Sequence, residues 1–372
     1  MIRICFMRWF GVVCGRCGAS DAKYFYLGRC RRCIHLRMDV LEPSPFMGDG
    51  QVVMQYDLTS YQKIVSDELC ALVNSGHDVY LEAVCGAGKT EMCLELIENL
   101  LAQGLRVGWA IPRRQVVLEL GERLAQYFPG IKVASVCGGN TDDVMGDLIV
   151  CTTHQLYRYH SYFDVLILDE PDAFPYFGNE MLEHMVNVSV RGPKVFLSAT
   201  LEDVPESFSR LNLSLRPSGK VLPEPVLVRS RVDVVRTLWS WRNESVLVFV
   251  PTRKLALRIS VLLGCSFITS ESEDKEAVLD RFRSTGGFLV CTSVLERGVT
   301  FVDCFVVVLY AEHSVFSKSS LIQIAGRVGR GMNPKKGEIV FWLRRMCREV
   351  DLCCLEIGQH NDRARSVLKA LM

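Results

Sequence analysis

The most specific chemistry in the sequence is carried by a run of eight residues that begins at Ala83 and ends Gly-Ala-Gly-Lys-Thr. The run follows a predicted strand over residues 79–84 and precedes a predicted helix that extends to about residue 103. In such a turn, the backbone amides and the N-terminus of the following helix form a cradle for phosphate oxygens. The strict pattern begins with glycine, and alanine stands there in this chain. The run predicts a nucleotide-binding loop.

Each part of this loop has an expected role. Gly86 and Gly88 let the backbone approach a phosphate because no Cβ stands in the way. The Lys89 ammonium is expected to reach the β- and γ-phosphates of ATP and to act in catalysis, and the Thr90 hydroxyl is expected to bind Mg²⁺. The predicted nucleotide-binding residues of the segment are Gly86, Ala87, Gly88, Lys89, Thr90 and Glu91.

A second motif supplies carboxylates. The apolar run Asp-Val-Leu-Ile-Leu-Asp-Glu ends in Asp169 and Glu170. In ATPases with such a loop, an Asp at the end of a neighbouring strand holds the hydration shell of Mg²⁺, and a following Glu orients the attacking water. An isolated acidic pair is usually a solvated turn, but its place after the loop favours Asp169 as a nucleotide and magnesium ligand and Glu170 as a catalytic residue. Two interpretations of Asp172 stay open, a role in the site and a cap of the next helix.

Two arginines near the C-terminus complete the predicted catalytic set. The segment Gln-Ile-Ala-Gly-Arg-Val-Gly-Arg places Arg327 and Arg330 three residues apart, on one face if the segment is helical. One or both can neutralise charge on the transferred γ-phosphoryl group, as an arginine finger does. For an isolated motif of this kind, a basic surface turn is the alternative.

Four cysteines near the N-terminus form two Cys-x-x-Cys pairs separated by twelve residues. This spacing suits tetrahedral zinc, with two thiolates supplied by each tight turn. Two redox pairs are the alternative, but no thioredoxin-like pattern surrounds them. The predicted zinc ligands are Cys14, Cys17, Cys30 and Cys33.

The same segment is basic and aromatic. Residues 1–37 hold eight Lys or Arg and one acidic residue, whereas the whole chain has a net charge of +1. Aromatic side chains beside arginines, here residues 24–32, can stack bases and contact phosphates of a single strand. The alternatives are a small apolar core that needs metal to fold, or a surface for a protein partner.

The pattern of elements predicts an α/β fold of two tandem parallel-sheet lobes, because continuous apolar strands alternate with helical stretches before and after a Pro- and Gly-rich segment. The predicted strands are 79–84, 106–111, 148–153, 164–170 and 194–200 before that segment, and 245–252, 265–269, 286–293, 303–310 and 337–342 after it. The predicted domains are a four-cysteine zinc module (1–40), a linker (41–55), a first lobe that binds ATP (56–215), a hinge (216–225) and a second lobe (226–372). Sixteen cysteines in a chain of this length do not indicate a small secreted disulfide scaffold. No apolar run is long enough to predict a membrane-spanning helix. A reducing, cytoplasmic location is expected.

These motifs, in this order over residues 56–331, resemble those of superfamily 2 helicases, whose core is a pair of RecA-like P-loop NTPase lobes. The segment at 56–62 is similar to the adenine-binding segment of that superfamily, with Gln62 facing the base. Segments 111–117, 150–156, 198–200, 248–252 and 291–301 are similar to its nucleic-acid contacts and to the motif that links hydrolysis to binding. The resemblance implies that the lobes close on ATP and reopen after hydrolysis.

The cysteine module together with Asp-Glu-Pro-Asp-Ala-Phe-Pro (169–175) resembles one family within that superfamily, the ComFA ATPases of bacterial competence. This resemblance implies translocation or unwinding on single-stranded DNA during natural transformation, with ATP, Mg²⁺ and Zn²⁺ as cofactors. It also implies a partner resembling phosphoribosyltransferases (ComFC), components of the DNA-uptake channel, and a place at the inner face of the cell membrane. The oligomeric state stays open, with a homo-oligomer among the possibilities.

Three alternatives stay open at the level of sequence. A replication-restart DNA helicase resembling PriA and an RNA helicase share most of the motifs. Gln323, where RNA helicases commonly have His, and the Asp-Glu-Pro-Asp spelling at residues 169–172 disfavour the RNA helicase. The alternative from another class is a zinc-dependent DNA-binding scaffold whose ATPase is idle, and the intact catalytic residues disfavour it.

Overall fold

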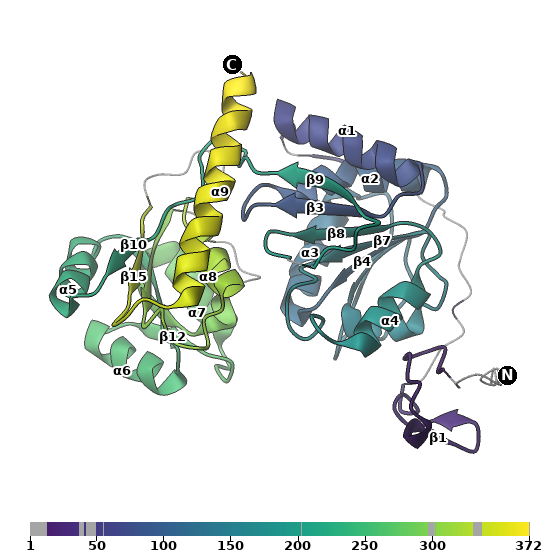
Figure 1. Cartoon of the computed structure of the whole chain (residues 1–372), viewed down its shortest axis with the longest axis horizontal. Coiled ribbons are helices and arrows are strands. Elements are labelled where there is room, and N and C mark those ends of the chain that lie inside the picture. The colour runs from purple at the N-terminus through teal and green to yellow at the C-terminus, as the bar shows by residue number, and fades with distance from the viewer. Residues whose placement is uncertain are drawn as a thin grey trace. The chain divides into compact units, whose positions relative to one another are not determined.

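The structure is a computed structural model that describes residues 13–36, 41, 50–54, 56–201, 203–296, 301, 303–329 and 337–371. The chain divides into two compact units (Figure 1). The first unit comprises Met1–Glu82 and Lys89–Asn212, and the second comprises Ala83–Gly88 and Leu213–Met372.

The described part of the first unit is built on a seven-stranded sheet, in the order β5-β6-β4-β7-β8-β3-β9. In chain order the strands are β3 (Val79–Ala83), β4 (Val107–Ile111), β5 (Val133–Val136), β6 (Leu148–Thr152), β7 (Val165–Asp169), β8 (Lys194–Ser198) and β9 (Ser209–Leu213). The helices are α1 (Ser60–Asn74), α2 (Lys89–Ala102), α3 (Arg114–Tyr127) and α4 (Glu180–Ser189), with a 3₁₀ turn η2 (Thr153–Arg158).

The apolar runs explain this sheet. Every residue of β4 and of β6 is buried, as expected for central strands covered on both faces. β4 pairs in parallel with β6 on one side and with β7 on the other. The carboxyl ends of these strands therefore meet at one edge, where side chains from separate strands can act together.

A second sheet forms the core of the second unit. The described residues give it six strands, in the order β10-β15-β14-β11-β13-β12, and each pair is parallel. The strands are β10 (Val226–Val228), β11 (Ser245–Phe249), β12 (Ser266–Ile268), β13 (Gly287–Cys291), β14 (Cys304–Leu309) and β15 (Ile339–Trp342). The helices are α5 (Arg231–Ser240), α6 (Arg253–Leu263), α7 (Lys275–Thr285), α8 (Lys318–Ala325) and α9 (Arg348–Leu371), with a 3₁₀ turn η3 (Ser293–Leu295). Two parallel-sheet units confirm the predicted α/β class.

The longest helix of the second unit, α9, packs beside α8 (Figure 1). One face of α9 is buried through Val350, Cys353 and Ile357, which recur at helical spacing. This helix follows the last strand and carries no motif that the sequence made recognisable.

The N-terminal cysteine segment folds as a small module of the first unit. A 3₁₀ turn η1 (Ala22–Tyr24) leads into an antiparallel hairpin of β1 (Phe25–Tyr26) and β2 (Arg29–Cys30). Leu27 and Gly28 at the hairpin tip both have positive φ, 45° and 74°, as a tight two-residue hairpin turn requires.

Two further findings concern the predicted organisation. Most of the predicted linker, including residues 42–49, lies outside the described residues. Within the described residues, no helix combines the length and the apolar character that crossing a membrane would need.

Candidate functional site

The predicted phosphate-binding loop has the backbone that its chemistry requires. It follows β3 directly and leads into α2, whose first two residues are Lys89 and Thr90. Gly86 and Gly88 have φ values of 81° and 84°, a region that a side chain would strain. The loop is closed by the Ala87 amide, which donates to the Val84 carbonyl over 3.0 Å. This turn at a helix N-terminus fits a polyphosphate.

Lys89 and Asp169 form an ion pair with 3.1 Å between Nζ and Oδ1. Their side chains are only 19% and 15% exposed, so each charge compensates the other away from water. Burial raises the pKa of Asp169, the Lys89 cation opposes that rise, and the neighbouring Glu170 carboxylate adds to it. The predicted phosphate ligand and the predicted magnesium ligand are thus brought together, one from α2 and the other from the end of β7.

The Thr90 hydroxyl has a partner that the sequence did not suggest. Arg123, on α3, donates from Nη2 to Thr90 Oγ1 over 2.5 Å. Thr90, the predicted magnesium ligand, is 9% exposed, and the Arg123 guanidinium lies within hydrogen-bond distance of it. Arg123 belongs to no motif with a recognisable spacing, and only the fold, which places α3 within reach of the start of α2, brings it to the site.

Glu170 is held in a strained conformation at the end of β7. Its φ is 54°, in the left-handed region, which costs a non-glycine residue roughly 1–2 kcal/mol. The Glu170 amide donates to the Leu197 carbonyl of β8 over 2.9 Å, which fixes this turn. Strain of this kind is common where a side chain must point in one direction for function.

Asp172 joins the acidic motif to the Ser-Ala-Thr segment at 198–200. The Ser198 hydroxyl donates to Asp172 Oδ1 over 2.6 Å, and the Thr200 hydroxyl donates to Oδ2 over 2.7 Å. Asp172 does not cap the next helix, because Asn179 is the N-cap of α4. The sequence left Asp172 open between a role in the site and a helix cap, and gave no signal for these two partners.

Two other predicted nucleotide-binding residues have structural partners. Gln62 is 4% exposed and completes a capping box at the start of α1, where its Oε1 accepts from the amide and the hydroxyl of Thr59, each over 3.0 Å. Glu91 accepts hydrogen bonds from the hydroxyls of Tyr127 (3.3 Å) and Tyr56 (3.5 Å). Their roles toward a nucleotide stay predictions.

Of the two predicted catalytic arginines, Arg327 follows α8 and is 1% exposed. Its Nε donates to the Glu296 carbonyl over 3.2 Å. Arg330 lies outside the described residues.

The four predicted zinc ligands form one cluster, with all Sγ atoms within 4.8 Å of one another and all four side chains buried. Two of the distances, Cys14 to Cys33 and Cys17 to Cys30, are 3.6 Å. Tetrahedral zinc with Zn–S bonds of about 2.3 Å separates its sulfur ligands by about 3.8 Å. The geometry therefore fits a four-coordinate metal site.

Hydrogen bonds within the cluster segment favour the thiolate form of Cys14. Burial alone would raise the pKa of Cys14, but hydrogen bonds from the amides of Arg16 and Cys17 bring its pKa down to about 7. The turn is closed by the Gly18 amide, which donates to the Cys14 carbonyl over 2.8 Å. Such amide-rich knuckles stabilise the charge of a metal-bound sulfur.

The module packs against α4 (Figure 1). The four cysteines share one apolar cluster with Leu182 and Met185 of that helix. His184 lies 3.4 Å from the Gly15 carbonyl through Nε2, and a Cβ at Gly18 would meet the His184 ring at 2.9 Å. The module therefore packs closely on α4 as part of the first unit.

The outer surface of the module joins aromatic rings to cations. Arg31 lies 5.1 Å from the ring centroid of Tyr26, and Arg32 lies 5.5 Å from that of Tyr24. Tyr26 is 61% exposed, so its ring is open to a flat partner. Tyr24 is half-buried and packs against the apolar cluster of the first unit. The exposed Tyr26 ring beside a guanidinium group matches the requirements for stacking a base and binding a phosphate.

Comparison with protein families places helicase domains over both units. The DEAD/DEAH box helicase family matches residues 59–208, and the family described as helicase conserved C-terminal domain matches residues 230–332. Among curated proteins, the competence protein ComFA of Streptococcus pneumoniae (strain ATCC BAA-255 / R6) is 32% identical, covering 94% of this chain and 90% of the relative. The competence protein ComFA of Bacillus subtilis (strain 168) is also 32% identical, covering 88% of this chain and 81% of the relative.

More distant similarities agree on the fold. An ATP-dependent RNA helicase, DRS1 of Yarrowia lipolytica (strain CLIB 122 / E 150), is 24% identical over 69% of this chain and 41% of its own. The structure of S. cerevisiae Dbp5 bound to RNA and ADP BeF3 aligns with a TM-score of 0.60 at 17% identity, covering 83% of this chain and 93% of that one. RecG bound to a three-way DNA junction aligns with a TM-score of 0.56 at 18% identity, covering 86% of this chain and 49% of that one. At these identities the two structures establish a shared helicase fold.

Proposed function

Since this chain belongs to the ComFA family of superfamily 2 helicases, we propose that it uses ATP hydrolysis to move along single-stranded DNA during DNA uptake in natural transformation. The chain is a helicase-type ATPase, and nucleic acid is the substrate class that its family implies. The Lys89–Asp169 pair beside the glycine loop supports the proposal most strongly, because it unites the two charges that ATP and Mg²⁺ need.

In the proposed mechanism, Lys89 would bind the β- and γ-phosphates of ATP. The Asp169 carboxylate and the Thr90 hydroxyl would hold Mg²⁺. Bound Mg²⁺ would withdraw negative charge from the phosphate oxygens. Both buried charges keep an opposite partner throughout, so neither bears the full cost of desolvation.

The remaining catalytic residues act on the attacking water and on the charge of the transferred γ-phosphoryl group. Glu170, held at its strained turn, is proposed to orient the attacking water. Arg327 and Arg330 are proposed to neutralise the γ-phosphoryl group in the transition state. Asp172 would pass changes at the acidic motif to Ser198 and Thr200, which it binds directly.

For the cysteine module we propose structural zinc held by Cys14, Cys17, Cys30 and Cys33. The small size of the module supports this, because few apolar residues are available to stabilise it without metal. Its exposed aromatic and basic surface is proposed to contact the DNA strand.

Replacing Tyr26 with Ala tests this DNA contact. Base stacking on an aromatic side chain contributes about 1–3 kcal/mol, so the Kd for a single-stranded oligonucleotide should rise about 5- to 150-fold in fluorescence anisotropy. Zinc content should not change, because Tyr26 is exposed and is not a ligand. Ile34→Ala is the matched control, since Ile34 is a 56% exposed apolar residue of the same module. Equal affinities for Tyr26→Ala and wild type would argue against the contact.

Family membership also supports several finer proposals. They are a complex with a phosphoribosyltransferase-like ComFC protein, contact with components of the DNA-uptake channel, self-association, and a place at the inner face of the cell membrane. Co-elution of the two purified proteins in size-exclusion chromatography tests the first, and separate elution at micromolar concentration would contradict it.

RNA is the second candidate track, favoured by the similarity to an RNA helicase of Yarrowia lipolytica. ATPase turnover measured with single-stranded DNA, duplex DNA and RNA distinguishes the two at a fixed salt of about 50 mM, repeated at about 200 mM. We expect single-stranded DNA to raise turnover several-fold and more than RNA does. Stimulation by RNA alone would contradict DNA uptake, and no turnover under any condition would favour a DNA-binding scaffold.

A further inference from the structure

Arg216, at the start of the predicted hinge, lies buried against the turn that follows α8. It is 3% exposed. Its Nη1 donates to the Val328 carbonyl over 2.7 Å and to the Gly329 carbonyl over 3.1 Å, and its Nη2 donates to the Gly326 carbonyl over 3.2 Å. One guanidinium therefore binds three carbonyls of a four-residue turn, and its Nε also donates to the Cys85 carbonyl of the phosphate-binding loop over 3.0 Å.

The chemistry of this turn explains why arginine suits it. Gly326 is the C-cap of α8, so its carbonyl lies at the helix end that carries partial negative charge, and the Val328 and Gly329 carbonyls follow in the turn beyond the helix. A cation at that position is stabilised by the charge, and the planar fork of arginine can reach several acceptors at once. Lysine carries the same charge but concentrates it on one nitrogen.

Arg327 belongs to this turn and lies between Gly326 and Val328 in the sequence. A separate contact holds the Arg327 side chain, whose Nε donates to the Glu296 carbonyl. The Glu296 carboxylate in turn accepts a hydrogen bond from the Ser320 hydroxyl on α8. Arg216 thus holds the backbone of the turn, while Glu296 orients the Arg327 side chain that the turn presents.

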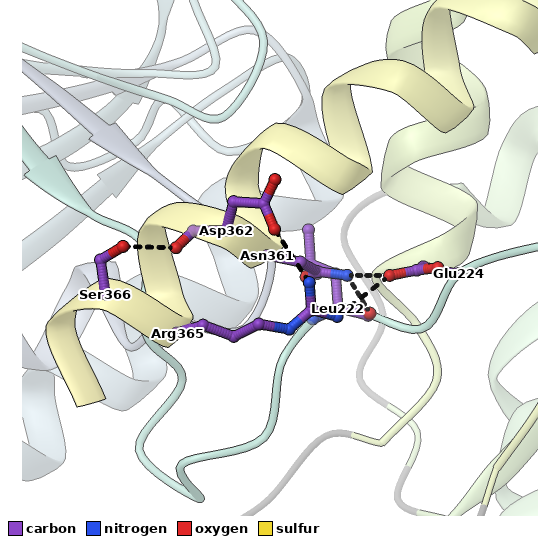
Figure 2. A network of polar contacts seen from close by, with 6 residues as sticks. All are labelled: Leu222, Glu224, Asn361, Asp362, Arg365 and Ser366. Atoms are coloured by element: carbon purple, nitrogen blue, oxygen red, sulfur yellow. Dashed lines mark hydrogen bonds and ion pairs between the residues drawn. The ribbon is translucent and has the colours of Figure 1, made fainter. Parts of the chain in front are cut away.

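The other end of the predicted hinge is anchored to α9 (Figure 2). Asn361, 1% exposed, accepts from the Leu222 amide over 2.8 Å and donates to the Leu222 carbonyl over 2.9 Å. Glu224 accepts from Asn361 over 3.2 Å and pairs with Arg365 at 3.3 Å. Because both ends of the segment are attached to the second unit, Arg216 is presented from a fixed support.

We propose that Arg216 is a positioning residue for ATP hydrolysis, holding the turn at residues 326–329 so that Arg327 meets the transferred phosphoryl group in the transition state. The inference rests on the proposed function, in which Arg327 acts on that group. It gives a role to a residue that no helicase motif of the sequence contains.

This role has a kinetic signature. Arg327 is proposed to stabilise the transition state, whereas ATP binding depends mainly on the phosphate loop. Loss of Arg216 should therefore lower kcat about 10- to 100-fold through misplacement, and the KM for ATP should change less than kcat does, because Arg216 holds the phosphate loop only at the Cys85 carbonyl. The affinity for ADP with aluminium fluoride, a transition-state analogue, should fall by a factor similar to that of kcat, and the affinity for ADP alone should fall less.

The experiment compares full-length Arg216→Ala, Arg216→Lys and Arg327→Ala with wild type, with melting temperature measured for each. Arg281→Ala is the matched control, because Arg281 is an exposed arginine of α7. The expected order of kcat is wild type, Arg216→Lys, Arg216→Ala, with the control at the wild-type value. Should Arg216→Ala fail to fold, Arg216→Lys alone makes the comparison of kcat, ADP affinity and analogue affinity.

A lower melting temperature with unchanged kcat and unchanged analogue affinity would overturn the proposal, since Arg216 would then only stabilise the fold. Equal losses of ADP and analogue affinity would also overturn it, because that pattern reports a disturbed phosphate loop. If Arg327→Ala keeps wild-type kcat, the phosphoryl role of Arg327 fails and the inference falls with it. If Arg327→Ala loses kcat and the Arg216 variants do not, the inference alone fails.

Discussion

Lys89→Ala should lose ATP turnover by at least about 100-fold and remain folded, because it removes a donor that the transition state needs. In the structure this ammonium is the partner of the Asp169 carboxylate, 3.1 Å away. Its removal leaves Asp169 buried without that cation, so the pKa of Asp169 should rise further, which weakens its hold on Mg²⁺. Steady-state phosphate release, with circular dichroism to check the fold, measures the effect.

A suitable control for this substitution is Lys63→Ala. Lys63 lies on α1, is 50% exposed, and pairs with Asp67 and Glu95 on the surface. Exposed pairs contribute at most about 1 kcal/mol, so turnover should match wild type. Retained turnover in Lys89→Ala would contradict the assignment of the phosphate loop.

The second large effect is expected at the cysteine cluster. The double substitution Cys30→Ser with Cys33→Ser removes two of four predicted thiolate ligands, and zinc content should fall from one equivalent per chain to near zero. Binding of structural zinc contributes on the order of 10 kcal/mol in small modules, so the module should unfold without it. Elemental analysis gives the metal content, and trypsin cleavage after the arginines at 29–32 reports the unfolding.

Two cysteines outside the cluster provide the control for this experiment. Cys347 and Cys354 are partly exposed residues of the second unit, and their double substitution by serine should leave the zinc content unchanged. Full zinc content in Cys30→Ser with Cys33→Ser would show that the metal, if bound, is held elsewhere. Absence of zinc in wild-type protein purified without chelator would contradict a structural zinc site.

Much of the fold follows from apolar runs that the sequence displays openly. The predicted strands around 106–111, 148–153 and 164–170 correspond to β4, β6 and β7, because buried parallel strands need continuous apolar residues. Three strands, β5, β9 and β10, were not predicted. β9 contains Ser209, Arg210 and Asn212, and β10 is three residues long, so neither carries the periodicity of a strand.

The residues of the candidate site also fall into those that the sequence predicts and those that it does not. The loop, the acidic pair and the cysteine knuckles depend on neighbours in sequence, so spacing alone predicts them, and their functional roles stay predictions. Arg123, the Asp172 link to Ser198 and the Arg216 contacts join residues far apart in the chain. Such contacts depend on how helices and strands pack, and a single sequence carries no local signal for them.

The central claim is that ATP hydrolysis moves this protein along single-stranded DNA. The direct measurement is the time that it takes to reach a fluorophore at the end of a strand, over a series of strand lengths, with the label at each end in turn. The account predicts that with ATP the arrival time grows in proportion to length for one label position, and that Lys89→Ala gives no such dependence. Turnover of ATP with arrival times independent of length at both ends would contradict it.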